Sequence, residues 1–191
     1  GKEITDFTHS PADGLLHIRF PNESRPRVLD VSQAAAETVK RVALELGGKS
    51  PNVILPDADL ALAIPGVAMA TFFLQGQNCM AGTRIFAHAA IHDQLVEGLA
   101  AFSKMLPVGH GLDPASMIGP MVSEIHCGKV MGYIEAGKRD GASVALGGDA
   151  PSNGGGYFVN PTILVDVNPQ MSVVREEIFG PVVVAQRFDD L

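Results

Sequence analysis

Cys79 has the setting that a nucleophilic cysteine requires. It lies in the segment QGQNCMAGTR, between Gly76 and Gly82 and after a long apolar stretch. Glycines let the backbone approach a ligand closely, and backbone N–H groups at a loop-to-helix junction stabilise a thiolate. A small cysteine that only fills the core fits the same spacing, so both interpretations of Cys79 stay open at this point. Cys127 lies in the middle of an expected helix, in SEIHCGKV, and a packing role is predicted for it.

Carboxylates occupy two further segments that could do chemistry. Glu45 lies between two leucines in LELGGKSP, ahead of a Gly-Gly turn. An apolar pocket raises the pKa of a carboxylate, which then acts as a base near neutral pH. The alternative is a surface glutamate that caps the turn. Glu176 and Glu177 form an acidic pair in REEIFGP, which suits either the binding of ribose hydroxyls or a solvated helical face.

Several other kinds of site are not indicated by the sequence. No cluster of cysteines and histidines has zinc-site spacing, so no metal site is predicted. Neither GxGxxG nor GxxxxGK[ST] occurs, so the chain is expected to have no phosphate cradle of its own. None of the six histidines is paired with Cys79 by a recognisable spacing, which makes a Cys–His hydrolase a weak interpretation.

The composition excludes other classes of protein. The 191 residues suffice for one domain with a real core, and 46% of them are hydrophobic, which excludes disorder. A net charge of −7 with no basic stripe argues against a nucleic-acid partner. No signal peptide is seen, and the longest uncharged apolar stretch, residues 60–74, is shorter than the ~20 residues that span a bilayer. We therefore expect a soluble, cytoplasmic protein without a membrane partner.

Alternating strands and helices are expected to position these residues. Residues 1–31 are rich in Pro, Asp, Ser and Arg and form a divergent N-terminal segment, with one or two short strands around LLHIRF. Pro65 is expected to kink or split a helix that is apolar nearly all round. The order predicts an α/β fold with a mostly parallel open sheet flanked by helices. The predicted helices are 34–44, 58–76, 92–106, 121–141 and a short one near 173–180, and the predicted strands are 52–56, 84–91, 143–148, 157–167 and 182–188.

Taken together, three motifs of the chain resemble the aldehyde dehydrogenase superfamily. ELGGKSPNVILPDADL is similar to the glutamate signature of that family, FFLQGQNCMAGTR to its cysteine signature, and EEIFGPVV to its cofactor-contacting loop. Glu45 and Cys79 lie 34 positions apart, the separation expected between the base and the nucleophile of the family. The resemblance extends from about residue 31 to residue 191.

This resemblance implies oxidation of an aldehyde to a carboxylic acid with NAD or NADP as cofactor. Cys79 would attack the aldehyde carbonyl to form a thiohemiacetal, and hydride transfer to the nicotinamide would leave a thioester. Glu45 would activate the water that hydrolyses this thioester, and the backbone N–H of Cys79 would form half of the oxyanion hole. Asn78 occupies a position that varies in the family and is assigned no role. The cofactor-binding residues implied are Glu177 at the ribose hydroxyls, Phe179 beside the nicotinamide ribose, and Leu46 and Gly47 under the nicotinamide.

The chain also departs from the family pattern. The dinucleotide-binding domain of the family lies mostly before the glutamate signature, whereas 44 residues precede Glu45 here and residues 1–31 do not resemble that domain. The interpretation is a divergent segment over 1–31 followed by a truncated catalytic domain over 32–191, either part of a longer protein or a natural short relative. Weak or no dehydrogenase activity is therefore expected of this chain by itself.

Two other functions stay open. Without a cofactor domain, Cys79 could still act as a slow thiol esterase, and a non-catalytic relative would bind partners through the surface where the missing domain docks. The family's C-terminal oligomerisation strand is not found, although an exposed sheet edge favours a homo-oligomer. Measurable NAD(P) affinity, ester turnover without cofactor, or neither would separate the three functions.

Overall fold

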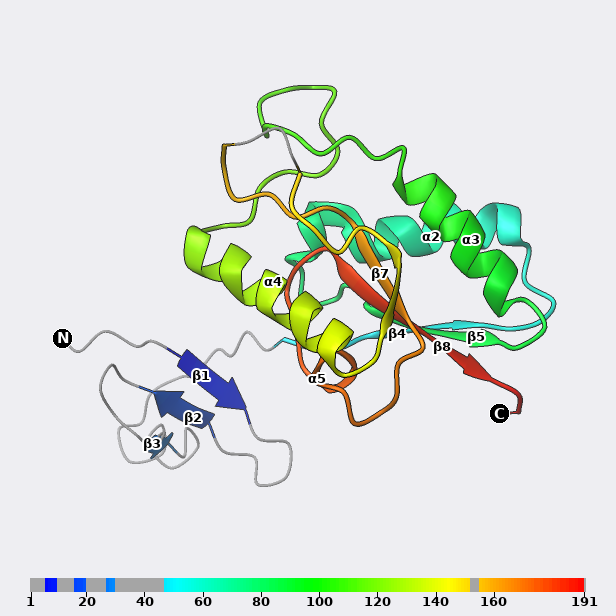
Figure 1. Cartoon of the computed structure of the whole chain (residues 1–191), viewed down its shortest axis with the longest axis horizontal. Helices are drawn as coiled ribbons and strands as arrows, with labels where there is room; N and C mark the ends of the chain where they lie inside the picture. The colour runs from blue at the N-terminus through cyan, green and yellow to red at the C-terminus, as the bar shows by residue number, and fades with distance from the viewer. Residues whose placement is uncertain (1–5, 10–15, 20–26, 30–46, 152–154, 191) are drawn as a thin grey trace, which may run out of the picture. The chain divides into compact units, whose positions relative to one another are not determined.

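The computed structural model describes residues 6–9, 16–19, 27–29, 47–151 and 155–190, which belong to two units, Gly1–Leu46 and Gly47–Leu191. The first unit contains an antiparallel sheet in the order β1-β2-β3, where the sequence predicted one or two strands. The helix predicted over 34–44 lies outside the described residues. The strands of this sheet are β1, Asp6–His9, β2, Leu16–Arg19, and β3, Arg27–Leu29 (Figure 1).

The second unit is built on a five-stranded sheet in the order β4-β5-β8-β7-β6 (Figure 1). β4 pairs with β5, β5 with β8 and β8 with β7 in parallel, whereas β6 pairs with β7 antiparallel. The predicted mostly parallel sheet is therefore confirmed, and all five strands predicted after residue 47 are found. They are β4, Pro51–Ile54, β5, Arg84–His88, β6, Ser143–Leu146, β7, Thr162–Val165, and β8, Val182–Phe188.

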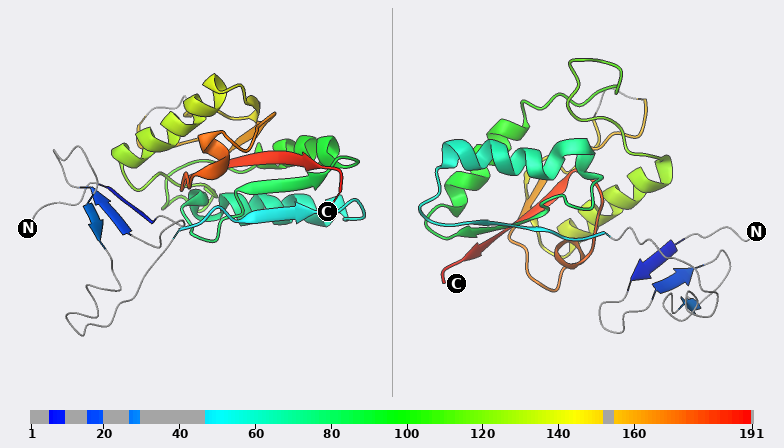
Figure 2. Two further views of the ribbon diagram at one scale, coloured as in Figure 1. Left: turned by 90° about the horizontal axis from the view of Figure 1, so that it is seen from below. Right: turned by 180° about the vertical axis from the view of Figure 1, so that it is seen from behind.

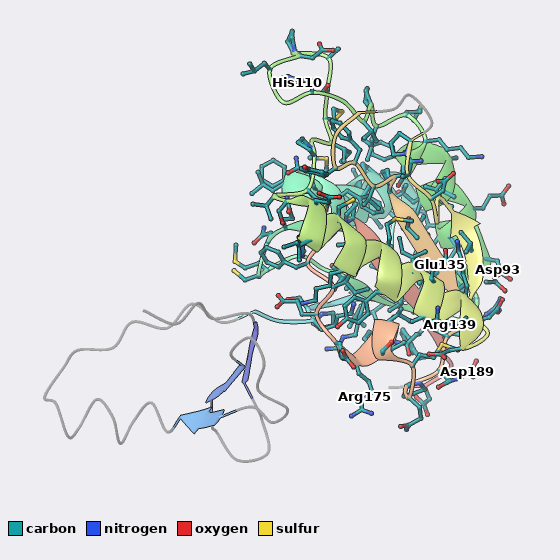
Figure 3. The ribbon with its side chains drawn as sticks, turned by 60° about the vertical axis from the view of Figure 1, so that its left-hand side comes forward. Asp93, His110, Glu135, Arg139, Arg175 and Asp189 are labelled. Atoms are coloured by element: carbon teal, nitrogen blue, oxygen red, sulfur yellow. The ribbon has the colours of Figure 1, made fainter. Side chains whose placement is uncertain are left out.

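Helices cover both faces of this sheet (Figure 2). On one face lie α2, Leu60–Phe72, and α3, His92–Ser103, and on the other lie α4, Glu124–Arg139, and α5, Ser172–Arg175. Successive side chains of a strand point to opposite faces. In β8, Val183 accordingly packs in the core under α2 and α3, and Val182 and Val184 pack in the core under α4 and α5. The outer side of α4 carries charged side chains, among them Glu135 and Arg139 (Figure 3).

α2 begins at a capping residue and continues past its proline. Oδ1 of Asp59 accepts a hydrogen bond from the N–H of Ala61 at 2.9 Å. Of the kink or split expected at Pro65, the split does not occur, because α2 is a single element across the proline. The proline removes one main-chain hydrogen bond, and Phe72 holds the far end of the helix in the core. Although α2 is apolar nearly all round, it is not buried all round, since Leu62 is 73% exposed. Within the ranges given above, no helix has both the length and the apolar character needed to cross a membrane.

Candidate active site

Cys79 lies in a turn between α2 and β5, and its side chain is exposed. α2 is followed by a 3-10 helix, η1, Phe73–Gly76, in which Leu74 (φ 53°), Gln75 (φ 61°) and Gly76 (φ 66°) have left-handed backbone conformations. These conformations end the helix and redirect the chain before it reaches Cys79. The sequence leaves residues 77–84 open as a loop or the start of a helix, and the structure confirms the loop, because the next regular element after Cys79 is the strand β5.

The side chain of Asn78 shapes the turn around the thiol. Its Oδ1 accepts a hydrogen bond from the N–H of Met80 at 3.0 Å, and the thiol of Cys79 donates to the same oxygen at 3.8 Å. The carbonyl of Asn78 accepts from the N–H of Ala81 at 3.0 Å. Asn78 was assigned no role from the sequence. A structural role could have been inferred from residue type, because an asparagine side chain tends to accept a hydrogen bond from the backbone N–H two residues further on.

The downstream end of this turn is fixed through Gly82. The N–H of Gly82 donates to the carbonyl of Ala70 at 3.0 Å. The carbonyl of Gly82 accepts from the buried hydroxyl of Thr71 and from Nδ2 of Asn52, both at 2.8 Å. Neither Thr71 nor Asn52 was predicted to serve the site. For Thr71, the sequence offered one indication: it is a threonine in an otherwise apolar helix, and a buried hydroxyl needs a hydrogen-bond partner.

The cysteine motif and the EEIFGPVV motif meet at two glycines. A Cβ at Gly76 would lie 2.2 Å from the carbonyl oxygen of Gly180, so the two backbones are in direct contact and a side chain at this position does not fit. Gly180 is itself buried against α4, where a Cβ would lie 2.7 Å from Cγ2 of Val130. The turn that carries Cys79 is therefore packed on the loop that carries Glu177 and Phe179.

The Gly-Gly turn of the glutamate motif contacts both other motifs. The N–H of Gly48 donates to Oε1 of Glu177 at 3.0 Å, and a Cβ at Gly47 would lie 2.0 Å from Oε2 of the same carboxylate. A Cβ at Gly48 would lie 3.4 Å from the carbonyl oxygen of Cys79. Gly47 and Glu177, both of which the family resemblance implies as cofactor-binding residues, thus lie together, with the main chain of Cys79 beside them.

The two glutamates of the acidic pair have different surroundings. Glu176 is exposed, and its Oε2 accepts a hydrogen bond from the hydroxyl of Tyr133 at 2.7 Å. Glu177 is half-buried on the glycine turn. The interpretation as a solvated face therefore applies to Glu176 alone. Glu45 and Leu46 lie outside the described residues, and their roles stay predictions.

Two neighbouring side chains of α4 face the C-terminal half of the unit. Nε2 of His126 donates to the carbonyl of Phe179 at 2.6 Å. Cys127 is half-buried, packs against the core under α4, and donates its thiol to the carbonyl of Phe158 at 3.9 Å. Burial, and secondarily the charge of Glu124, raises the pKa of this thiol. The packing role predicted for Cys127 is confirmed.

Lys49, next to the glycine turn, has a side chain whose charged form is destabilised by burial. Its carbonyl accepts from Nε of Arg84 at 2.7 Å, while its Nζ is buried and has no hydrogen-bond partner among the described residues. Burial, helped by the charge of Arg84, lowers the pKa of Lys49 to about 8, and the opposing charges of Glu177 and Glu176 limit the change. A buried ammonium without a partner reduces the stability of the fold.

We expect the unfolding free energy of the wild type to rise relative to that of Lys49→Met between about pH 8 and 10.5. In this window the unfolded chain keeps the lysine proton and the folded chain has lost it, so stability increases with pH. The total gain is at most about 3 kcal/mol. Urea titrations across this pH range measure it, with Lys104→Met, a change at an exposed lysine, as control. Parallel curves for the wild type and Lys49→Met would contradict the prediction.

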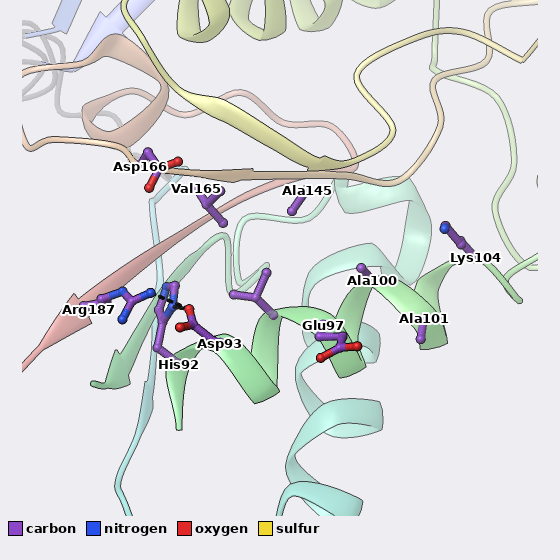
Figure 4. Close-up of a pocket in the computed structure, with 11 residues that line it drawn as sticks. His92, Asp93, Glu97, Ala100, Ala101, Lys104, Ala145, Val165, Asp166 and Arg187 are labelled. Carbon is purple, nitrogen blue, oxygen red and sulfur yellow. Dashed lines mark hydrogen bonds and ion pairs between the residues drawn. The ribbon is translucent and has the colours of Figure 1, made fainter. Parts of the chain in front are cut away.

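A cavity of about 590 Å³ lies away from these motifs, between α3 and the carboxyl ends of β7 and β8 (Figure 4). Oδ1 of Asp93 accepts there from Nδ1 of His92 at 3.0 Å and from Nη2 of Arg187, and these bonds, the one from His92 first, lower the pKa of Asp93. The cavity contains neither Cys79 nor Glu177 and is not part of their site. In the part of the chain that the structure describes, no three His, Cys, Asp or Glu side chains are arranged to hold a metal.

The fold and the site together define the class of this protein. It is a mostly parallel α/β unit in which a glycine turn contacts a glutamate, and an exposed cysteine lies beside that contact. The model of the aldehyde dehydrogenase family matches residues 24–191. The chain belongs to the aldehyde dehydrogenase family. The resemblance and the fold class expected from the sequence are confirmed, and the division at residue 31 stays a prediction.

Individual relatives agree with this assignment. The betaine aldehyde dehydrogenase of Mesorhizobium japonicum is 44% identical over 169 residues, 87% of this chain and 35% of that protein. The NAD⁺ complex of an aldehyde dehydrogenase from Bacillus cereus is 45% identical, with a TM-score of 0.79 over 83% of this chain and 32% of that one. The NAD-dependent aldehyde dehydrogenase of Sinorhizobium meliloti is 42% identical, with a TM-score of 0.80 and the same coverage. This chain spans about a third of the length of these relatives.

Proposed function

We propose that this chain carries the nucleophile and part of the nicotinamide site of an aldehyde dehydrogenase that oxidises a small-molecule aldehyde. The observation that supports this most directly is the contact of the Gly47–Gly48 turn with both the Glu177 carboxylate and the main chain of Cys79. The relatives add support, since one was solved with NAD⁺ and another is a betaine aldehyde dehydrogenase. NAD or NADP is the proposed cofactor.

The proposed chemistry begins at the exposed Sγ of Cys79. The thiolate attacks the carbonyl carbon, a C–S bond forms, and the carbonyl oxygen takes up a proton to give a thiohemiacetal. The chemistry that NAD(P) supplies when bound is acceptance of a hydride from this carbon, and loss of the hydroxyl proton to solvent then leaves a thioester. Water then attacks the thioester, the C–S bond breaks, and the carboxylic acid and the Cys79 thiolate are released. Glu45 is proposed, on the family resemblance, to take the proton of this water.

The residues at the glycine turn fit the ribose that adjoins a nicotinamide. A carboxylate has about four acceptor positions, and the N–H of Gly48 occupies one on Oε1 of Glu177, which leaves acceptors for two hydroxyl groups. Gly47 has no Cβ, so the Glu177 carboxylate can lie directly against the backbone of the glycine turn. We assign both residues to the cofactor, together with Phe179 and Leu46 on the resemblance.

We expect Glu177→Gln to weaken NADH binding by roughly ten-fold or more, because an amide replaces a charged acceptor by a weaker one. Fluorescence titration of the 191-residue chain with NADH measures the dissociation constant. Glu176→Gln is the matched control, since it makes the same chemical change at the adjacent exposed residue, and its affinity should equal that of the wild type. Equal loss in both variants, or loss in neither, would remove Glu177 from the cofactor site.

The same preparation separates the proposed function from its alternatives. NADH affinity that depends on Glu177 supports the dehydrogenase. Ester hydrolysis without NADH affinity would instead support the thiol esterase. Neither property would support a non-catalytic relative that binds a partner.

A further inference from the structure

A histidine outside the three motifs holds the loop that follows Glu177. His126 lies in the first turn of α4, where its N–H donates to Oγ of Ser123, the residue that caps the helix, at 3.2 Å. Its half-buried ring reaches a residue 53 positions later in the sequence. Nε2 donates to the carbonyl of Phe179 at 2.6 Å, and the two rings meet edge to face with their centroids 6.0 Å apart.

Phe179 needs such a contact because of its backbone conformation. Its φ is 59°, in the left-handed region that a bulky side chain rarely adopts, and such a conformation persists only where the surroundings stabilise it. Gly180, the next residue, is buried against Val130 of α4 and meets Gly76. The hydrogen bond from His126 therefore holds the peptide group between Phe179 and Gly180, next to this glycine contact.

We propose that His126 is a positioning residue that orients Phe179 for binding of the nicotinamide cofactor. It acts through a hydrogen bond to the Phe179 carbonyl and an edge contact to the Phe179 ring, without touching the cofactor. This inference rests on the proposed function, which assigns Phe179 to the cofactor site. A carbonyl oxygen only accepts, so the neutral His126 ring must carry its proton on Nε2.

Three substitutions in the 191-residue chain separate the two contacts. His126→Gln keeps a donor, His126→Phe keeps a ring, and His126→Ala keeps neither. We expect the alanine and phenylalanine variants to bind NADH about five- to ten-fold more weakly, as loss of one partly buried hydrogen bond predicts, and the glutamine variant to stay within about two-fold of the wild type. The labelling rate of Cys79 by a thiol reagent should stay unchanged in all three. Glu135→Gln, on the outer side of α4, is the control.

Two further measurements test the contact itself, so that its failure is distinct from failure of the proposed function. Amide hydrogen exchange over residues 177–180 should accelerate in His126→Ala and His126→Phe and be restored in His126→Gln. The ring ¹⁵N shifts of neutral His126 should report the Nε2–H form. If the wild type binds no NADH, the cofactor assignment and the role of His126 toward it both fail, while faster exchange still shows that His126 orders the loop. Wild-type NADH affinity in His126→Phe, or the Nδ1–H form, overturns the inference.

Discussion

Cys79→Ala should lower ester hydrolysis, and any aldehyde-dependent NAD(P)H formation, by more than about a thousand-fold. The thiolate supplies the bond that both reactions need, and alanine has no atom that can form an acyl intermediate. The side chain is exposed, so its removal leaves no cavity and the fold should be unaffected. Hydrolysis of a chromogenic ester and the absorbance of NAD(P)H measure the two reactions.

Cys127→Ala is the control for this experiment. Its thiol is half-buried against the core under α4, so the substitution should reduce stability slightly and leave the chemistry intact. If Cys79→Ala still hydrolyses the ester and Cys127→Ala does not, the assignment of Cys79 as the nucleophile is contradicted. Selective labelling of Cys79 in a wild type without dehydrogenase turnover would show a reactive nucleophile whose cofactor site is incomplete in this chain.

Gly76→Ala should destabilise the chain by about 3 kcal/mol or more. Two effects add at this position. The φ of 66° is unfavourable for alanine, and the new Cβ would lie 2.2 Å from the carbonyl oxygen of Gly180, a backbone atom that cannot move without displacing the loop. Urea denaturation measures the change in unfolding free energy. Because the displaced loop supports the turn before Cys79, the labelling rate of Cys79 should change as well.

Gly66→Ala provides the matched comparison. Gly66 lies inside α2, and a Cβ there would meet nothing within 4 Å. Alanine is the better helix former, so this variant should be more stable than the wild type by about 0.5–1 kcal/mol. Equal stability of Gly76→Ala and the wild type would mean that the two glycine backbones do not meet as the structure shows.

Short-range patterns account for the parts of the fold that the sequence predicted correctly. The valines of β8 form a short apolar run that is typical of a strand buried on both faces, and the structure places Val182 and Val183 in opposite cores. Asp57 and Asp59 both precede the apolar segment and suit a helix cap, and the structure gives Asp59 as the residue that caps α2. The helix is not split at Pro65, because tertiary packing of the helix outweighs one lost hydrogen bond.

Long-range contacts decided the site. By itself the sequence determined the family, the mostly parallel sheet and Cys79 as a candidate nucleophile, because residue type and local order carry that information. Residue chemistry alone could not distinguish Glu176 from Glu177, which are chemically identical neighbours, and Glu177 was singled out by the family resemblance. Only the tertiary structure placed one against the hydroxyl of Tyr133 and the other on the N–H of Gly48, 129 positions earlier. The partner of each carboxylate depends on which distant backbone segments pack together, and no local pattern records that packing.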